Sequence, residues 1–155
     1  MKLRFLFVGR TRSSYLAEGV KDYLGRLRAY LPAEEVIVRG AKARDDRAAE
    51  VRAQDTARLL GRLAPGEAFV HLDPEGREMT SLELADWLRG RMEDGTKQAA
   101  FGLGGPLGLD EGAARRADLR LCLSRLTLTH EMSRLVLLEQ VYRALRLNSG
   151  HPYHK

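Results

Sequence analysis

Short apolar runs alternate with longer amphipathic segments along the whole chain. The runs, such as KLRFLFV near the start and QAAFGL further on, are rich in β-branched, aromatic or small residues and are typical of buried strands. The longer segments place apolar residues three and four positions apart, as in helices with a buried face. Strands are predicted at residues 2–8, 35–39, 68–72, 98–103 and 119–123, and helices at residues 13–30, 45–63, 80–92, 110–117 and 131–147.

This alternation predicts an α/β fold with a mainly parallel sheet. Ser13 or Ser14 is the expected cap of the first helix, and Thr80 or Ser81 that of the third. Residues 73–76, with the sequence DPEG, are expected to form a turn at the end of the third strand. No internal repeat, low-complexity segment or change of composition marks a linker, so residues 1–155 are interpreted as one domain.

The composition is that of a soluble globular protein, with 44% apolar and 30% charged residues. No apolar run approaches the length of a membrane span, and Lys2 and Arg4 stand where a signal peptide would have its apolar core. The one cysteine, Cys122, has no partner for an internal disulfide, which fits a reducing cytoplasm. It lies in the apolar run LRLCLS and is interpreted as a buried strand residue, not a nucleophile.

Positive charge is concentrated near the C-terminus. The formal net charge is +5, and residues 120–155 hold six basic and two acidic residues, whereas the first 119 residues are nearly neutral. A basic segment on a balanced body indicates a polyanionic partner, because phosphate contacts give affinity that does not depend on sequence. On charge alone, a solvated surface with spare arginines explains the pattern equally well.

Candidate chemistry lies where the strands end, since ligands of open α/β sheets bind beyond the carboxyl ends of the strands. Three such ends stand out: Leu72-Asp73-Pro74, Leu103-Gly104-Gly105, and residues 123–127. Paired glycines allow a backbone to approach a ligand closely, so such loops can hold an adenine and a ribose through backbone groups. A Gly-Gly pair by itself is equally often a tight turn.

Several familiar motifs are absent. Leu107 stands where a dinucleotide-binding G-x-G-x-x-G would need its last glycine. His130-Glu131 begins an apparent zinc-protease motif, but Arg134 occupies the position of the second ligand. His151 and His154 have no partner cysteines, so no metal site is expected.

The last predicted helix is apolar on more than one face, which indicates burial against both the sheet and a second subunit. Its Arg143 stands four residues after Glu139, the spacing of an ordinary surface ion pair. In the tail that follows, Tyr153 can stack on an unpaired base, and Lys155 and Arg143 can meet phosphate or carbonyl oxygens. His154 can transfer a proton near neutral pH. An exposed tail with an accidental histidine content, or a tag remnant, is the alternative.

Four motifs occur in one order along the second half of the chain: LDPEG, LGGPLG, LSRLTLTHEMSRLVLLEQVYRA and GHPYHK. In this series the chain resembles the ribosomal RNA large-subunit methyltransferase H family of the SPOUT, or α/β-knot, methyltransferases. The resemblance implies a five- to six-stranded sheet flanked by helices, a C-terminal trefoil knot, and a homodimer in which the tail of one subunit completes the other's site. It implies methylation of N3 of a pseudouridine in a stem-loop of 23S ribosomal RNA, on the assembled ribosome.

The resemblance also implies residue roles. S-adenosyl-L-methionine would be held by Leu72, Gly104, Gly105, Ser124, Arg125, Leu126, Thr127, Leu128 and Thr129. Arg143 would stabilise negative charge on the base or contact phosphate, Tyr153 would orient the base, and His154 would accept the proton, a task that water can also perform. His130 would support the cofactor loop or the RNA, and Lys155 would contact the RNA.

The chain departs from the family pattern at three positions. Leu107 replaces a residue that is often polar, Thr129 replaces a common proline, and Arg77 replaces a usual lysine. None of these changes removes a reacting group. Two other functions stay open at this point: a SPOUT methyltransferase acting on transfer RNA, and a non-catalytic module that binds the ribosome through the same basic tail.

Overall fold

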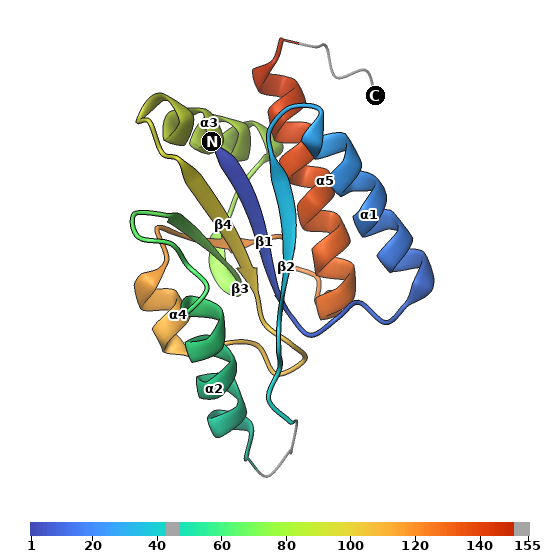
Figure 1. Ribbon diagram of the computed structural model, residues 1–155, viewed down its shortest axis with the longest axis vertical. Coiled ribbons are helices and arrows are strands. Elements are labelled where there is room, and N and C mark those ends of the chain that lie inside the picture. The colour runs from blue at the N-terminus through green and yellow to red at the C-terminus, as the bar shows by residue number, and fades with distance from the viewer. Residues whose placement is uncertain (43–46, 151–155) are drawn as a thin grey trace.

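In the part of the chain that the structure describes, five parallel strands form one sheet in the order β2-β1-β4-β3-β5 (Figure 1). The strands are β1 (Lys2–Val8), β2 (Ala33–Val38), β3 (Ala68–Glu78), β4 (Gln98–Leu103) and β5 (Leu119–Cys122). The computed structural model describes residues 1–42 and 47–150. Within those residues, the predicted α/β class and the parallel sheet flanked by helices are confirmed.

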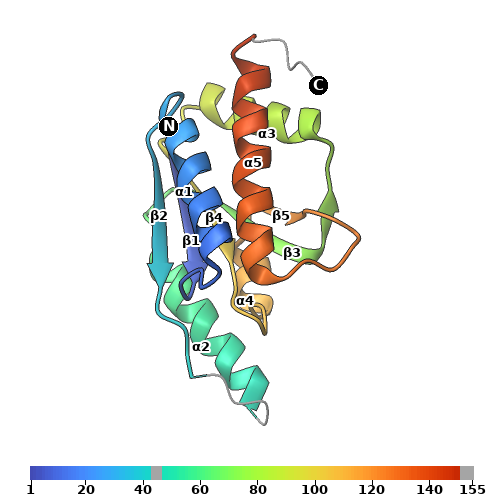
Figure 2. The same cartoon turned by 90° about the vertical axis from the view of Figure 1, so that its right-hand side faces the viewer.

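Helices cover both faces of the sheet. One face is covered by α1 (Ser14–Arg28), α3 (Ser81–Glu93) and α5 (His130–Asn148), and the other by α2 (Ala48–Leu60) and α4 (Glu111–Arg116). The long helix α5 lies between α1 and α3 and contacts both (Figure 2). Both α1 and α5 begin beside the carboxyl ends of the strands and run back along the sheet (Figure 2).

The side chains of β1 alternate between two cores, as a strand with a period of two requires. Leu3, Phe5 and Phe7 face the layer of α1, α3 and α5, whereas Leu6 and Val8 face α2 and α4. All five are at most 4% exposed. A strand that is apolar on both faces belongs in the middle of a sheet, and β1 lies between β2 and β4.

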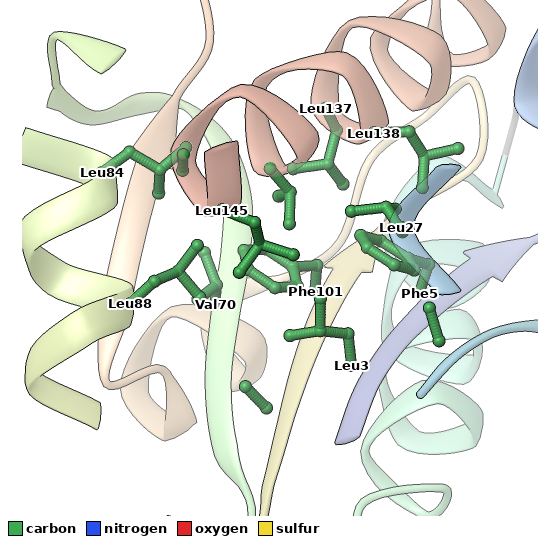
Figure 3. Close-up of a cluster of buried hydrophobic side chains, with 14 of the residues drawn as sticks. Leu3, Phe5, Leu27, Val70, Leu84, Leu88, Phe101, Leu137, Leu138 and Leu145 are labelled. Atoms are coloured by element: carbon green, nitrogen blue, oxygen red, sulfur yellow. The ribbon is translucent and has the colours of Figure 1, made fainter. Parts of the chain in front are cut away.

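The larger core lies beneath α5. Figure 3 shows Leu137, Leu138 and Leu145 of this helix gathered over Phe5 and Phe101 of the sheet. The rings of Phe5 and Phe101 are stacked, with 5.4 Å between their centroids. Burial of each such side chain contributes about 1.5–3 kcal/mol, so this core fixes the position of α5 on the sheet.

The strand β3 is longer than predicted. It continues to Glu78 instead of ending at Leu72, and both Leu72 and Arg77 pair with Leu121 of β5. The intervening residues 73–76 form a bulge, after which the chain returns to β5. A Cβ on Gly76 would lie 2.7 Å from a backbone atom of Arg120, so the return requires glycine. The prediction that residues 73–76 end the strand with a turn is therefore wrong.

Other boundaries also differ from the prediction, and α1 ends at Arg28 instead of at residue 30. The strand β2 spans Ala33–Val38 instead of residues 35–39, and α2 spans Ala48–Leu60, whereas residues 45–63 were predicted. Residues 45 and 46 lie outside the described part of the chain. Boundaries depend on local hydrogen bonds that apolar spacing does not reveal.

The caps of α1 and α3 differ in kind. Thr80, one of the two predicted caps, begins α3 and forms a reciprocal capping box with Glu83: Thr80 Oγ1 accepts from Glu83 N at 3.2 Å, and Glu83 Oε2 accepts from Thr80 N at 2.8 Å. Ser13, one of the two predicted caps, is the N-cap residue of α1, but its side chain makes no capping hydrogen bond. No helix among residues 1–42 and 47–150 has the length and hydropathy needed to cross a lipid bilayer.

Candidate active site at the carboxyl edge of the sheet

The three strand ends singled out from the sequence lie side by side. The strand β3 is flanked by β4 and β5, with His71 paired to Gly102 of β4 and Leu72 paired to Leu121 of β5. Leu72 therefore lies beside the ends of β4 and β5, next to Gly104 and the segment that starts at Leu123. The parallel topology brings together groups that are distant in sequence.

Residues 104–108 fold into a tight turn that only glycine permits at two of its positions. Gly108 N donates to Gly105 O at 2.9 Å, and Gly108 has a φ of 75°. A Cβ on Gly104 would lie 2.6 Å from the carbonyl carbon of Gly108. The turn thus packs backbone on backbone and presents main-chain polar groups without side chains between them.

The loop of residues 124–129 keeps much of its own backbone unpaired. Ser124 Oγ accepts from Leu126 N at 3.0 Å. In the part of the chain that the structure describes, the amides of Arg125, Thr127 and Leu128 donate to no protein group. The loop ends at Thr129, whose Oγ1 accepts from Met132 N at 3.2 Å and caps α5. These free donors can form hydrogen bonds to a small polar ligand.

Glu131 in the first turn of α5 holds the segment between β1 and α1. Its two carboxylate oxygens accept from Arg12 N and Ser13 N, each at 3.0 Å. These backbone hydrogen bonds lower the pKa of Glu131, chiefly the one from Ser13. The carboxylate holds the backbone immediately before the first turn of α1, at the N-cap residue Ser13 and at Arg12.

Arg134, one turn further along α5, is fully buried, at 0% exposed. Its Nη2 donates to Val8 O at 2.8 Å and its Nη1 to Thr11 Oγ1 at 3.0 Å. The guanidinium lies over the ring of Phe7, 5.1 Å from the centroid. Burial lowers its pKa, while Glu131 and Glu35 oppose that shift. Arg134 therefore joins the start of α5 to the end of β1.

Two histidines lie near this edge. His130 begins α5, and its pKa is lowered by burial and by the charge of Arg134. His71 on β3 is buried, with Nδ1 3.8 Å from Asp73 Oδ2. Burial lowers the pKa of His71, and the Asp73 carboxylate opposes the shift. Asp73 in turn accepts from Arg120 Nε and Nη2, at 2.9 and 2.8 Å.

Arg143 lies far from this edge within its own chain. The rise of an α-helix places it about 20 Å along the axis from Thr129. Its Nε and Nη2 both donate to Glu139 Oε1, at 3.1 and 2.7 Å, so the predicted pair of Glu139 and Arg143 is present. Glu139 Oε2 accepts from Gln140, whose own amide oxygen accepts from Ser81 of α3 at 2.6 Å. These contacts fix the Glu139 carboxylate and, through it, the guanidinium.

The remaining predicted site residues, Tyr153, His154 and Lys155, lie outside the described residues. Among residues 1–42 and 47–150, no group of three or more histidine, cysteine, aspartate or glutamate side chains is placed to hold a metal ion.

Comparison with known proteins identifies the family. The profile described as "Predicted SPOUT methyltransferase" matches residues 1–154. The chain belongs to the SPOUT methyltransferase family. It is 44% identical to the ribosomal RNA large subunit methyltransferase H of Solidesulfovibrio magneticus over 98% of this chain and 97% of that protein. It is 38% identical to the protein of the same name from Geobacter sp., over 99% of both chains.

A solved structure supports the fold of this SPOUT methyltransferase. The probable methylase family protein from Haemophilus influenzae Rd KW20 superposes with a TM-score of 0.58, covering 99% of this chain and 70% of that one. The two sequences are only 10% identical, so the likeness concerns the fold. The resemblance to the methyltransferase H group seen in the sequence is thus confirmed by relatives that match nearly the full chain.

Sequence reasoning missed two residues that shape this edge of the methyltransferase. Glu131 and Arg134 were considered only as a failed zinc motif, although they fasten the β1–α1 segment to α5. One signal was available, since Arg134 is the arginine on the predicted helix closest to its start, next to a run of apolar residues. A buried arginine in such a position needs fixed acceptors, and backbone carbonyls at a strand end provide them.

Proposed function

We propose that this chain transfers a methyl group from S-adenosyl-L-methionine to N3 of a pseudouridine in a stem-loop of 23S ribosomal RNA, on the assembled ribosome in the cytoplasm. The observation that carries the proposal is the 44% identity, over nearly both full lengths, to a ribosomal RNA large subunit methyltransferase H. The ordered motifs around residues 104–108 and 121–143 lie in that match. The whole of residues 1–155 acts as one domain in this proposal.

The carboxyl edge fits the proposed cofactor. Gly104 and Gly105 are buried and bring main chain close together at the end of β4, Leu72 offers an apolar contact at β3, and the amides of Arg125, Thr127 and Leu128 make no hydrogen bond within residues 1–42 and 47–150. An adenine needs such backbone donors and acceptors at its edge and apolar contacts on its faces. When bound there, S-adenosyl-L-methionine supplies an electrophilic methyl group on a sulfonium.

The nucleophile is an imide nitrogen that must lose a proton, so the chain must provide alignment, positive charge and a proton acceptor. Arg143 is proposed to stabilise negative charge on the uracil carbonyls, with its orientation set by Glu139. Tyr153 is proposed to orient the base and His154 to accept the proton, while His130 and Lys155 contact the RNA. A base in a loop is already partly unstacked, which lowers the cost of presenting it.

The position of Arg143 supports a homodimer with a composite site. Arg143 lies about 20 Å along α5 from the loop that is proposed to hold the cofactor. A second subunit that packs against α5 in a two-fold arrangement can bring its own Arg143 and tail to this loop. The trefoil knot implied by the family resemblance remains part of the proposal.

Mixed dimers test the composite site. Arg143→Ala and Gly104→Ala are each expected to inactivate the homodimer, the first by removing the charge and the second by disrupting the cofactor turn. Co-expression of the two variants produces heterodimers with one intact site, and we expect activity to return to about a quarter of the wild-type value. Activity that stays at the level of the single variants would show that Arg143 acts within its own chain.

The reaction is tested by mass analysis of ribosomal RNA from a strain that lacks the gene. One methyl group should be missing from a pseudouridine of the large-subunit RNA and return when the chain is supplied. A missing methyl group on transfer RNA instead would select the other RNA substrate. Calorimetry without any heat of S-adenosyl-L-methionine binding, together with unchanged RNA masses, would select the non-catalytic binding module.

A further inference from the structure

The carboxyl edge of the sheet continues beyond the proposed cofactor site, onto the ends of β1 and β2. These strands are neighbours, and Val8 pairs with Val38, so the segments that follow them leave the sheet side by side. Residues 9–13 read GRTRS and residues 39–42 read RGAK. Together they contain four basic residues and no acidic one. Arg10, Arg12, Arg39 and Lys42 are termed the basic edge below.

The side chains of the basic edge differ from most other arginines on this surface. All four residues are exposed, and none of their side chains has a hydrogen bond or ion pair with any residue in the described ranges 1–42 and 47–150. Several exposed arginines elsewhere pair with nearby acids, as Arg26 does with Asp22 and Arg89 does with Asp86. The basic edge therefore carries positive charge that its described surroundings do not neutralise.

The backbone beneath these side chains is held in place. Glu131 accepts from Arg12 N, and the buried carboxylate of Asp55 accepts from Ala41 N at 2.6 Å. Arg58 Nη1 donates to Arg39 O at 3.1 Å. The carboxylate of Glu131 already occupies the amides of Arg12 and Ser13, so the charged donors that remain on this segment are the side chains of Arg10 and Arg12. The basic side chains thus extend from a backbone that hydrogen bonds hold in place.

The basic edge adjoins the proposed site directly. The strand β1 lies between β2 and β4, and a Cβ on Gly105 would lie 3.6 Å from the side chain of Val8. Tyr15, in the first turn of α1 after the same segment, is 66% exposed and adds an aromatic ring to this end of the molecule. An extended polyanion that reaches the proposed site from the β4 side of the sheet would pass over the carboxyl ends of β1 and β2.

We propose that the basic edge contacts the phosphate backbone of the RNA strand that flanks the target nucleotide; this inference rests on the proposed function. Arginine and lysine side chains bind phosphates and release condensed counterions, which gives affinity and position without reading sequence. The basic edge would therefore orient the stem-loop across the sheet, while the base itself is selected at the neighbouring site.

Binding to large ribosomal subunits from a strain that lacks the methyltransferase tests this inference. The test protein is the triple variant Arg10→Gln, Arg12→Gln, Arg39→Gln, and the matched control is Arg62→Gln, Lys97→Gln, Arg115→Gln, which removes three exposed cations elsewhere. Affinity is measured at several salt concentrations. We expect the triple variant to bind about tenfold or more weakly at low salt, with a log-log salt slope smaller by about two to three. The control should match the wild type.

Methyl transfer and cofactor binding separate the possible failures. If the wild type methylates the subunits and the triple variant keeps the affinity and salt slope of the control, the proposed phosphate contact of the basic edge is contradicted. The proposed function then still stands. If the wild type binds the subunits but transfers no methyl group, the proposed function fails, while a smaller salt slope in the triple variant still supports the basic edge.

Two further readouts guard against misfolding. The triple variant should retain the wild-type affinity for S-adenosyl-L-methionine in calorimetry, and its KM for subunits should rise while kcat changes little. A second variant, Arg10→Lys, Arg12→Lys, Arg39→Lys, keeps the positive charge and should have the salt slope of the wild type. A lysine variant that binds as weakly as the glutamine variant would contradict a phosphate contact.

Discussion

The two halves of the carboxyl edge are built by different means. At the ends of β1 and β2, carboxylates and a guanidinium from helices hold the chain: Glu131, Arg134 and Asp55 all bond to backbone groups. At the ends of β4 and β5, no helix side chain in residues 1–42 and 47–150 bonds to the glycine turn that starts at Gly104, and the loop after Ser124 is held by its own hydroxyls on Ser124 and Thr129. In the first half, helix side chains thus hold the backbone, whereas in the second the amides of Arg125, Thr127 and Leu128 make no hydrogen bond within the described residues.

The half at β1 and β2 fastens helices to the sheet, whereas the half at β4 and β5 can bind a ligand. At β1 and β2, helix carboxylates hold the amides of Arg12, Ser13 and Ala41, and these segments present four basic side chains. A backbone with free amides can bind a small polar molecule directly, provided that glycine or a loop keeps side chains away. Four substitutions test whether the two halves really depend on different interactions.

The largest effect is expected at Arg134. Replacement by methionine leaves the carbonyl of Val8 without its charged donor and separates α5 from the β1–α1 segment. We expect Arg134→Met to lower the free energy of unfolding by about 2–3 kcal/mol, even though an arginine no longer has to be desolvated. Urea denaturation gives the value, with the exposed Arg115→Met as the matched control at less than about 0.5 kcal/mol. Equal losses in the two variants would refute the structural role of Arg134.

Gly104 tests the other half. A Cβ there would lie 2.6 Å from the carbonyl carbon of Gly108, so the turn must open in Gly104→Ala. We expect S-adenosyl-L-methionine to bind at least about tenfold more weakly, a loss of about 1.4 kcal/mol, as measured by calorimetry.

The same substitution at Gly90 of α3 provides its control, because nothing lies within 4 Å of a Cβ there. Gly90→Ala should raise the free energy of unfolding by about 0.5–1 kcal/mol, because alanine favours a helix. Unchanged cofactor affinity in Gly104→Ala would show that the turn is not part of the cofactor site.

Glu131 should contribute less than Arg134 to the free energy of unfolding, and its contribution should depend on pH. Its pKa is lowered by hydrogen bonds from Ser13 N and Arg12 N, so its stabilisation is present above the unfolded pKa of about 4.3 and is lost as pH falls through the folded pKa. Glu131→Gln should cost about 1 kcal/mol at pH 7, as for loss of a helix cap, and should flatten the stability curve at acid pH. Thr129→Ala, which removes the side-chain cap of α5 on Met132 N, should cost a similar amount without that flattening, because no carboxylate in the described residues bonds to Thr129.

The smallest effect is expected at His71. Burial lowers its pKa, so the neutral form is favoured by folding; stability is fully present above the unfolded pKa of about 6.5 and declines as pH falls below it. His71→Phe should keep the stability at pH 7.5 within about 1 kcal/mol and reduce the decline between pH 6.5 and 5. Thermal melts across that range give the comparison, and an unaltered slope would mean that His71 is not the titrating group.

Local pattern predicted most of the secondary structure. The predicted limits agree within one residue for β1, β4 and α3. Apolar spacing and the Thr80 cap, which define these limits, are both local signals. The strand β3 did not, since its continuation past Leu72 depends on pairing with β5, some fifty residues away along the chain. A strand boundary set by a distant partner leaves no local mark apart from Gly76.

The candidate site was predicted unevenly for the same reason. Gly104, Gly105 and the loop after Ser124 were found because strand ends in a parallel α/β sheet share one edge. The roles of Glu131 and Arg134 depend on which loop α5 faces once it has packed on the sheet, and periodicity does not encode that. The basic edge was likewise hidden, because Arg10 and Arg39 are about thirty residues apart in sequence and adjacent only through β1 and β2.

The sequence by itself determined the α/β class, the strands buried on both faces and the ordered motifs that identify a SPOUT methyltransferase. Each of these follows from residue type at short spacing, which sets local backbone preference and burial. The tertiary structure alone decided which charges are buried, which amides remain free and which strand ends lie side by side. Those properties depend on contacts across more than a hundred residues, such as the one between Arg134 and Val8, and only the packed helices and sheet bring such groups within bonding distance.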